Sequence, residues 1–381
     1  MKTFKYISIS LLALSSIFSS CSLERNPLDK FSENVFWNSE DNAILAIIGI
    51  YRSNIQFNGP EYNPSDWWSY GGLLFLEFAS DNAYDRRGSN SNFHKLSDGN
   101  LLANNAYINN YWSNSYKKIY RCNNFLQNID KLSASQAVID RLKAEARFLR
   151  ATQYFYLSQY FHDVPLVTQI LSLDEANTVK KSPKSDIVNF VILELTEASK
   201  HLPNFKKLKA EEQGRASKQA SLAFLGRALL AENRFEEAAT TYEEIINMGE
   251  NSIDPNYQSL FYPSNENSSE NIFSMQYLQD LAGSGLPQHA YPVKDGGWCI
   301  INLTASLFEA YQFNNGESFD YNNKLYDNTN LGKNRDPRLD YTIYYNQAEF
   351  MGAKYVCHPD SQSLDKIMTG QTTQTGFMPR K

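Results

Sequence analysis

The chain has 381 residues, of which 42% are hydrophobic, so it can bury a sizeable core and does not have the composition of a disordered protein. Its 36 Lys and Arg against 42 Asp and Glu give a net charge of -6, which argues against a nucleic-acid or polyanion surface. Aromatic residues reach 14%. Tyr and Trp join a flat apolar face to a polar group, which suits a helical core or a binding surface.

Residues 1–20 have the features of a signal peptide. Two lysines begin the segment, residues 7–18 are uncharged and apolar, and two serines precede Cys21. A cysteine in this place is typical of a bacterial lipoprotein, in which Cys21 becomes the lipidated first residue, although Phe18 replaces the usual leucine. The alternative is an ordinary secretory signal with an incidental cysteine. An acyl anchor holds a protein to a membrane without spanning it, and no later stretch has the roughly 18 apolar residues of a spanning helix.

Removal of this signal leaves 34 basic and 42 acidic residues, a net charge of -8. The three remaining cysteines, Cys122, Cys299 and Cys357, form no C-x-x-C pair and no metal-ligand spacing, so we predict isolated thiols and no metal site, with one disulfide as the alternative. Nucleotide-binding and nucleophile motifs are absent from the sequence, and no cofactor is expected.

Apolar residues at helical spacing predict a mainly α fold for residues 21–250. The spacing recurs in four segments, 40–55, 105–132, 139–161 and 186–201. The third ends before a Val-Pro pair, because proline disfavours helical geometry in the residue before it. The sequence therefore predicts successive antiparallel helices.

Residues 219–249 carry the most informative pattern of this half. Large and small residues follow the order of a tetratricopeptide repeat, with Gly226 and Ala238 where two helices approach closely. The earlier helices keep the antiparallel pairing but lack the full tetratricopeptide signature. We therefore predict a tetratricopeptide-like scaffold of helical pairs. Such arrays usually bind through exposed surfaces and carry no chemistry of their own.

Residues 251–381 differ in composition and periodicity from the helical half. Asn, Ser, Gly, Tyr and Pro dominate, helical periodicity survives only near residues 303–313, and LDYTIYYN at 339–346 indicates short strands. We interpret this half as long ordered loops over a helical scaffold. Surface loops on a rigid scaffold are where binding residues tend to lie.

Five blocks in this order resemble the SusD/RagB family, and they cover essentially the whole chain after Cys21. The most specific is Ala-Glu-Ala-x-Phe-x-Arg-Ala followed by Val-Pro-Leu. The blocks are NPLDKFSENVFW at 26–37, SDN at 80–82, AEARFLRATQYFYLSQYFHDVPLV at 144–167, GRASKQASLAFLGRALL at 214–230 and NRDPRL at 334–339. The resemblance implies a lipid-anchored, cell-surface lipoprotein of the outer membrane that captures an oligosaccharide or peptide. It also implies transfer of that ligand to a SusC-like TonB-dependent transporter, without catalysis.

Two departures from the family pattern stand out. Where the family commonly has glycine before the aspartate that leads to Val-Pro-Leu, this sequence has His162. Residues 375–381 resemble the lead-in to a final helical pair with an Arg-Tyr-Ala-Glu block, and that block is missing. We therefore expect a truncated chain whose last repeat leaves an apolar face uncovered, which repeat arrays tolerate poorly.

A glycan site needs flat aromatic rings beside a few fixed polar groups, because sugars present C–H faces and hydroxyls. Two segments offer this mixture. One is a ligand loop within residues 56–104, and the other is PQHAYPVKDGGWCI at 287–300. From them we predict ligand contacts by Trp67, Trp68, Tyr70, Tyr84, Arg86, Phe93, His94, Tyr291 and Trp298. The match to the family's ligand-contacting regions is regional, since no residue-level motif is shared.

Several of these rings have a structural alternative. Adjacent residues of an extended segment point to opposite sides, so we expect one of Trp67 and Trp68 to be an anchor and the other to be exposed. Trp298 follows two glycines that allow a close approach of the backbone, and it is equally explained as a ligand platform or a loop anchor. Trp37 and Trp112 fall in scaffold blocks and are predicted to lie in the core.

Other functions remain open at this stage. A peptide or glycoprotein binder of the same architecture would show fewer aromatic platforms and a deep polar cleft. A glycoside hydrolase would need two carboxylates flanking the cleaved bond, and no recognisable catalytic motif holds them. A bare assembly scaffold would associate with a transporter without ligand affinity. Residues 334–339 are predicted to tie down a loop. We predict a glycan-binding protein that is not an enzyme.

Overall fold

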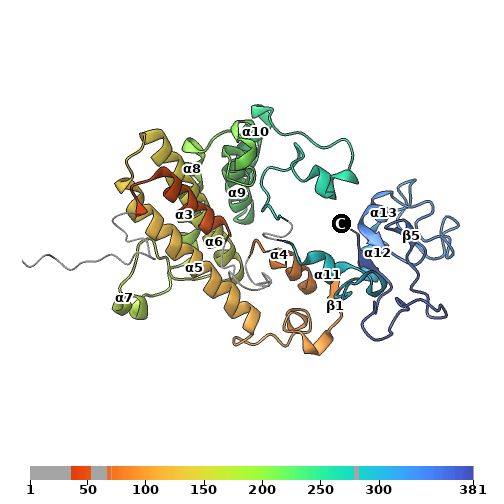
Figure 1. Cartoon of the computed structure of the whole chain (residues 1–381). Helices are drawn as coiled ribbons and strands as arrows, with labels where there is room; N and C mark the ends of the chain where they lie inside the picture. The colour runs from red at the N-terminus through yellow and green to blue at the C-terminus, as the bar shows by residue number, and fades with distance from the viewer. Residues whose placement is uncertain (1–35, 53–66, 70, 279–282, 381) are drawn as a thin grey trace, which may run out of the picture.

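The computed structural model describes residues 36–52, 67–69, 71–278 and 283–380 (Figure 1). The predicted mainly α architecture is confirmed. Long helices gather on one side of the molecule, and the chain after α10 forms a loop-rich half on the other side. The long helices are α3 (Glu40–Arg52), α5 (Ala106–Asn128), α6 (Gln136–Phe161), α8 (Lys184–His201), α9 (Lys218–Ala231) and α10 (Phe235–Met248).

Shorter elements connect and extend this scaffold. Among the described residues, the strands pair antiparallel in three two-stranded sheets, β1 with β2, β3 with β6 and β4 with β5. The short helices are α4 (Gly72–Phe75), α7 (Leu173–Thr178), α11 (Leu286–Ala290), α12 (Ala305–Ala310) and α13 (Arg338–Thr342). The strands are β1 (Ala83–Asp85), β2 (Ile301–Leu303), β3 (Ile343–Tyr344), β4 (Glu349–Phe350), β5 (Ala353–Lys354) and β6 (Met378–Pro379).

Polar side chains fix the starts of three long helices. Asn105 accepts hydrogen bonds from the first backbone amides of α5, and Ser135 and Ser217 do the same for α6 and α9. The carboxyl end of α10 is set by Gly249, whose left-handed φ of 62° suits glycine. These local signals, with the periodic apolar residues, explain why the helices form where the sequence predicts them.

The helices pack in chain order around α6. Helix α6 lies against α3, α5 and α8, and α9 packs between α8 and α10. The helical pair α9 and α10 depends on Gly226, since a Cβ there would lie 2.6 Å from the ring of Tyr242. Ala238 is buried as predicted. On α10, Phe235 and Ile246 remain 60% and 74% exposed, but the exposed Glu236, Glu237, Glu243 and Glu244 lie on the same helix, so its exposed surface is mixed and not apolar.

The Ala-Glu-Ala-x-Phe-x-Arg-Ala block holds the scaffold together through two buried charges. Glu145 accepts a hydrogen bond from the Tyr51 hydroxyl at 2.9 Å and pairs with Arg215 at 2.6 Å. One turn further along α6, Arg150 pairs with Glu194 of α8 at 2.5 Å and donates to Asn123 of α5 at 2.7 Å. The block therefore joins α6 to four other segments, which gives it a structural role.

A second buried cation organises the loop-rich half. The guanidinium of Arg335 lies 4.5 Å from the ring centre of Phe308 and 4.0 Å from that of Phe319. It also donates to the backbone oxygens of Phe308 and Tyr311, both at 2.7 Å. The prediction that this region ties down a loop is confirmed for Arg335, whereas the side chains of Asp336 and Arg338 pair with each other.

The expected short strands were only partly found. Residues 338–342 of the LDYTIYYN region form the helix α13, which follows Pro337, and only residues 343 and 344 form a strand. The tryptophan assignments to the scaffold are confirmed, since Trp37 is 4% exposed and Trp112 packs against the core. The three cysteines Cys122, Cys299 and Cys357 are buried free thiols.

The predicted signal peptide and Cys21 lie outside the described residues. In the part of the chain that the structure describes, no helix combines the length and the apolar character needed to cross a bilayer.

His162 ends helix α6 in a conformation that glycine adopts without strain. Its φ and ψ are 66° and -102°, a region that L-residues rarely enter. We expect His162→Gly to raise the free energy of unfolding by about 1 to 2 kcal/mol, because the strain is relieved. Urea denaturation measures the change. His162→Ala is the matched control, since it removes the imidazole and keeps the strain; an equal gain in both variants would contradict the explanation.

Candidate functional site

The structure places Trp67 in the core. It is 3% exposed, its indole nitrogen donates to the Ser115 hydroxyl at 2.7 Å, and its ring stacks on those of Tyr111 and Tyr156 at centroid distances of 4.4 and 5.1 Å. A ring enclosed in this way presents no face to a sugar. The prediction of Trp67 as a ligand contact is corrected to an anchor that fixes the loop to the helices.

The side chain of Trp68 is partly buried and packs against the helical scaffold. Its ring lies 5.3 Å from that of Phe273 and 6.2 Å from that of Phe148, and the ammonium of Lys118 lies 4.9 Å from its centre. Trp67 is the anchor that was expected of one of the two rings, and Trp68, expected to be exposed, is only partly exposed. Residues 67–69 form a turn, so the alternation of an extended segment does not apply.

Phe93 is also a core residue. It is fully buried and stacks on Tyr107 at 3.9 Å, with Phe75 against its edge at 5.2 Å. Its prediction as a ligand contact is therefore wrong. The segment around it folds back on α4 and α5, and the ring of Phe93 is buried between them. Tyr70 lies outside the described residues.

The two predicted segments meet at the pair of strands β1 and β2. Tyr84 lies opposite Asn302 and Asp85 opposite Ile301, although the strands are far apart in sequence. The backbone amide of Arg86 continues the ladder by donating to Ile300 at 3.0 Å. This pairing brings Arg86 beside Trp298, which the sequence could not show.

Arg86 supports the loop that carries Trp298. Its Nε donates to the Cys299 carbonyl and its Nη2 to the Trp298 carbonyl, both at 3.0 Å. Cys299 has a left-handed φ of 48°, so these bonds stabilise a bend that a non-glycine residue otherwise disfavours. Arg86 was predicted as a ligand contact, and the structure shows two of its donors engaged in holding the Trp298 backbone.

Trp298 presents a fixed and exposed ring. Its side chain is 40% exposed, its backbone amide donates to the Gln288 carbonyl at 2.6 Å, and its ring meets the edge of His289 at 5.0 Å. The preceding residue must be glycine, since a Cβ at position 297 would collide with the carbonyl of Tyr291. Held by backbone on one side and His289 on the other, the ring keeps its orientation.

His289 behaves as an uncharged support. It is 1% exposed, and its Nδ1 lies 2.8 Å from the Gly285 carbonyl. Burial lowers the pKa of His289 below its usual value, so the ring is neutral near pH 7. The nearby Asp85 is 1% exposed and pairs with Arg87 at 2.7 Å. Asp85 and Arg87 neutralise each other, and the guanidinium of Arg86 adds one positive charge beneath Trp298.

The remaining predicted residues come from the same two segments. Tyr84 and His94 are half-buried and meet edge to face at 5.4 Å. Tyr291 is half-buried and packs on Phe350 at 5.4 Å. Sequence reasoning missed two exposed amides near the platform, Gln288 and Gln374, the second of which donates to the Arg86 carbonyl at 3.3 Å. No motif surrounds either glutamine, and only the fold brings Gln374 to this place.

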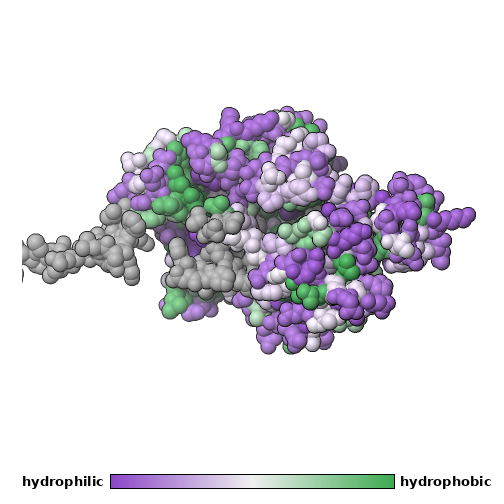
Figure 2. All heavy atoms as spheres, turned by 45° about the vertical axis from the view of Figure 1, so that its right-hand side comes forward, coloured by the Kyte–Doolittle hydropathy of each residue, from purple (hydrophilic) through white to green (hydrophobic). Residues whose placement is uncertain are grey.

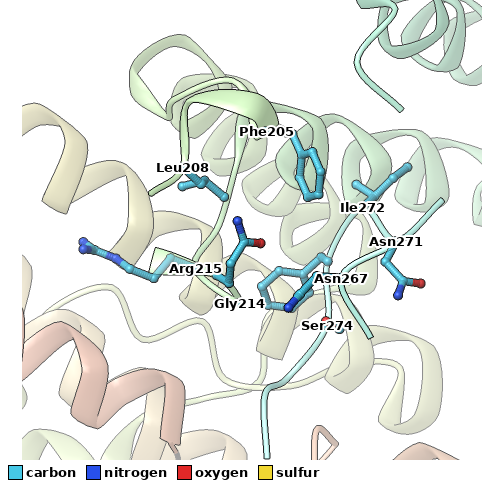
Figure 3. Close-up of a pocket in the computed structure, with 10 residues that line it drawn as sticks. Phe205, Leu208, Gly214, Arg215, Asn267, Asn271, Ile272 and Ser274 are labelled. Atoms are coloured by element: carbon cyan, nitrogen blue, oxygen red, sulfur yellow. The ribbon is translucent and has the colours of Figure 1, made fainter. Parts of the chain in front are cut away.

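A shallow recess elsewhere belongs to the scaffold. It lies between the loop before α9 and residues 267–274, and its space, including that open to solvent, is about 260 Å³ (Figure 3). Its lining includes Phe205, Leu208, Asn271 and Ile272, and none of the predicted ligand residues. Arg215 points away from it, toward its partner Glu145 (Figure 3). The recess is therefore not part of the predicted ligand site.

Within the described ranges, no group of three or more His, Cys, Asp or Glu side chains is placed to hold a metal ion. The face drawn in Figure 2 is mostly hydrophilic, with apolar side chains gathered in a few places. The chemistry that the Trp298 platform offers is stacking on a flat ring with amide groups around it.

Comparisons with known proteins agree with this architecture. A family model described as "Starch-binding associating with outer membrane" matches residues 71–230, and the SusD family model matches residues 244–381. A solved SusD-like carbohydrate-binding protein from Bacteroides fragilis superposes with a TM-score of 0.87 at 51% identity, covering 91% of this chain and 68% of that one. The chain belongs to the SusD/RagB family.

More distant SusD/RagB members extend the comparison. SusD-like protein P25 of Formosa agariphila is 29% identical over 273 residues, which are 68% of this chain and 49% of the relative. Surface glycan-binding protein A of Bacteroides thetaiotaomicron, solved with laminarihexaose, has a TM-score of 0.66 at 19% identity and covers 89% of this chain and 70% of that one. That last likeness shows the SusD fold alone. The chain spans about half the length of the curated SusD-like relatives it matches.

Proposed function

We propose that this SusD-like protein is a glycan-binding lipoprotein of the cell surface, held at the outer membrane through a lipid on Cys21. It captures oligosaccharides and passes them to a SusC-like TonB-dependent transporter. The observation that carries the binding proposal is the exposed and immobilised ring of Trp298. The 51% identical structure is that of a carbohydrate-binding protein, which supports the same class of ligand.

The proposed contact surface is smaller than the sequence suggested. Trp298 is the main platform, with Tyr84, His94 and Tyr291 at its edges, and Arg86 positions the platform from below. A rigid ring loses little conformational entropy when a sugar stacks on it, so more of the stacking energy appears as affinity. We propose no catalytic role, because the buried carboxylate of this site, Asp85, is already paired with Arg87.

We expect Trp298→Ala to weaken glycan binding at least about tenfold, because a central aromatic anchor of this kind contributes about 1.4 kcal/mol or more. The measurement is affinity electrophoresis of the soluble form from Ser22 through gels that contain laminarin, starch, xylan, mannan, dextran or pectin. Retardation of the wild type in at least one gel, reduced by the substitution, is the expected result.

Tyr120→Ala is the matched control for this experiment. Tyr120 is a 56% exposed aromatic side chain on the scaffold helix α5, away from the platform. It is expected to migrate as the wild type does in every gel. Equal retardation of the Trp298 variant and the wild type would contradict the platform. A folded wild type that no polysaccharide retards would favour a peptide ligand instead.

A further inference from the structure

A second group of exposed aromatic side chains follows helix α10, in a segment that the sequence analysis did not single out. Tyr257, Phe261 and Tyr262 lie within six residues and are 36%, 44% and 46% exposed. We call these three the 257–262 aromatic surface. Large rings are seldom exposed together without a binding role, because each leaves apolar area in contact with water.

The backbone beneath the 257–262 aromatic surface is held by one carboxylate. Asp254 accepts hydrogen bonds from the Ser268 hydroxyl at 2.6 Å, the Asn265 amide side chain at 2.9 Å and the Asn256 backbone amide at 2.9 Å. These bonds keep the pKa of Asp254 below its usual value, so it stays ionised. Tyr257 also meets the edge of Phe261 at 5.4 Å. Contacts within the segment thus hold its backbone and the pair of Tyr257 and Phe261.

Polar groups suited to hydroxyls surround these rings. Tyr257 lies 6.3 Å from Tyr341 of α13, and the exposed guanidinium of Arg338 on the same helix is fixed by Asp336 at 2.5 Å. Asn256, next to Tyr257 in the chain, is exposed. Flat rings with a planar cation and amides form the combination that recognises a sugar.

Buried aromatic rings connect this surface to the Trp298 platform. Tyr291, whose carbonyl accepts from the amide of Cys299 at 3.2 Å, packs on Phe350, and Phe350 meets Tyr344 at 4.6 Å. Tyr344 lies on β3, which directly follows α13, and the ring of Tyr341 on α13 lies 6.3 Å from that of Tyr257, so residues 338–344 contact both Phe350 and the 257–262 aromatic surface. In Figure 1 the segment after α10 extends toward α13, on the side where α11 and α12 lie.

We propose that the 257–262 aromatic surface binds further units of the glycan chain that stacks on Trp298, so that the site takes an extended linear oligosaccharide rather than a single terminal sugar. This inference rests on the proposed function. Two rigid platforms joined through one row of rings bind a long chain more tightly than either binds a short one, since the second contact is intramolecular once the first has formed.

The test compares short and long ligands on three forms of the protein. The probes are the polysaccharide that retards the wild type, together with a disaccharide and longer oligosaccharides cut from it. Isothermal titration calorimetry is made on the wild type, on Trp298→Ala and on a double variant, Phe261→Ala with Tyr262→Ala. The double variant is expected to lose about tenfold in affinity for the long oligosaccharides and nothing for the disaccharide. Trp298→Ala is expected to lose affinity for both.

Two results would overturn the inference and leave the proposed function intact. One is a double variant that binds the long oligosaccharides as tightly as the wild type while Trp298→Ala does not. The other is a wild type whose affinity does not rise with chain length. Circular dichroism and a thermal melt confirm that the double variant is folded, and Tyr120→Ala serves again as the matched exposed aromatic. Absence of binding by the wild type to every probe would contradict the proposed function itself.

Discussion

Replacement of Trp67 by alanine is expected to lower the free energy of unfolding by about 3 to 5 kcal/mol. The indole is almost fully buried, and its nitrogen bonds to Ser115. Its ring fills the space between Tyr111 of α5 and Tyr156 of α6. Alanine leaves a cavity between two helices and a buried hydroxyl without its donor, and both effects destabilise the fold.

Guanidinium denaturation measured by circular dichroism gives the change, with Trp298→Ala as the matched control. Both substitutions remove an indole from a predicted glycan contact, but only Trp67 is enclosed by the scaffold. The control is expected to unfold at nearly the wild-type midpoint. A Trp67 variant as stable as the wild type would contradict its role as an anchor.

Glu145→Ala is expected to destabilise the protein by about 3 to 5 kcal/mol, since breaking a buried pair leaves an uncompensated charge. Glu145 is fully buried, and the side chain of Arg215 is only 12% exposed. The substitution removes the acceptor of the Tyr51 hydroxyl and one of the two carboxylate partners of Arg215, the other being Glu212. Three segments of the scaffold, α3, α6 and the loop before α9, lose their common contact.

Glu197→Ala is the matched control for that carboxylate. Glu197 pairs with Lys200 on the exposed face of α8, where solvent screens the attraction. Its removal is expected to leave the denaturation midpoint unchanged in the same assay. Equal midpoints for the two variants would show that the buried network does not stabilise the fold.

The scaffold was predictable because its signals are local. Each long helix repeats apolar residues at helical spacing, and several begin at an Asn or Ser that caps their first amides. The Gly226 and Ala238 positions likewise follow from the close approach of two neighbouring helices. None of these features depends on a distant part of the chain.

The binding loops were less predictable because long-range contacts decide them. Strands β1 and β2 have three residues each and more than two hundred residues between them, so no local pattern announces their pairing. Trp67 and Phe93 have the same residue types as a sugar platform, and only their burial against α5 shows that they are anchors. The exposed rings of Tyr257, Phe261 and Tyr262 were not predicted as a site, because no sequence motif surrounds them.

A crystal structure of the protein with a bound oligosaccharide, taken from the polysaccharide that retards it most, would show whether Trp298 is the platform. We expect a sugar ring stacked on the exposed face of Trp298, with Tyr84, His94 or Tyr291 at its edge. An oligosaccharide bound elsewhere, with the Trp298 ring still in contact with water, would contradict it.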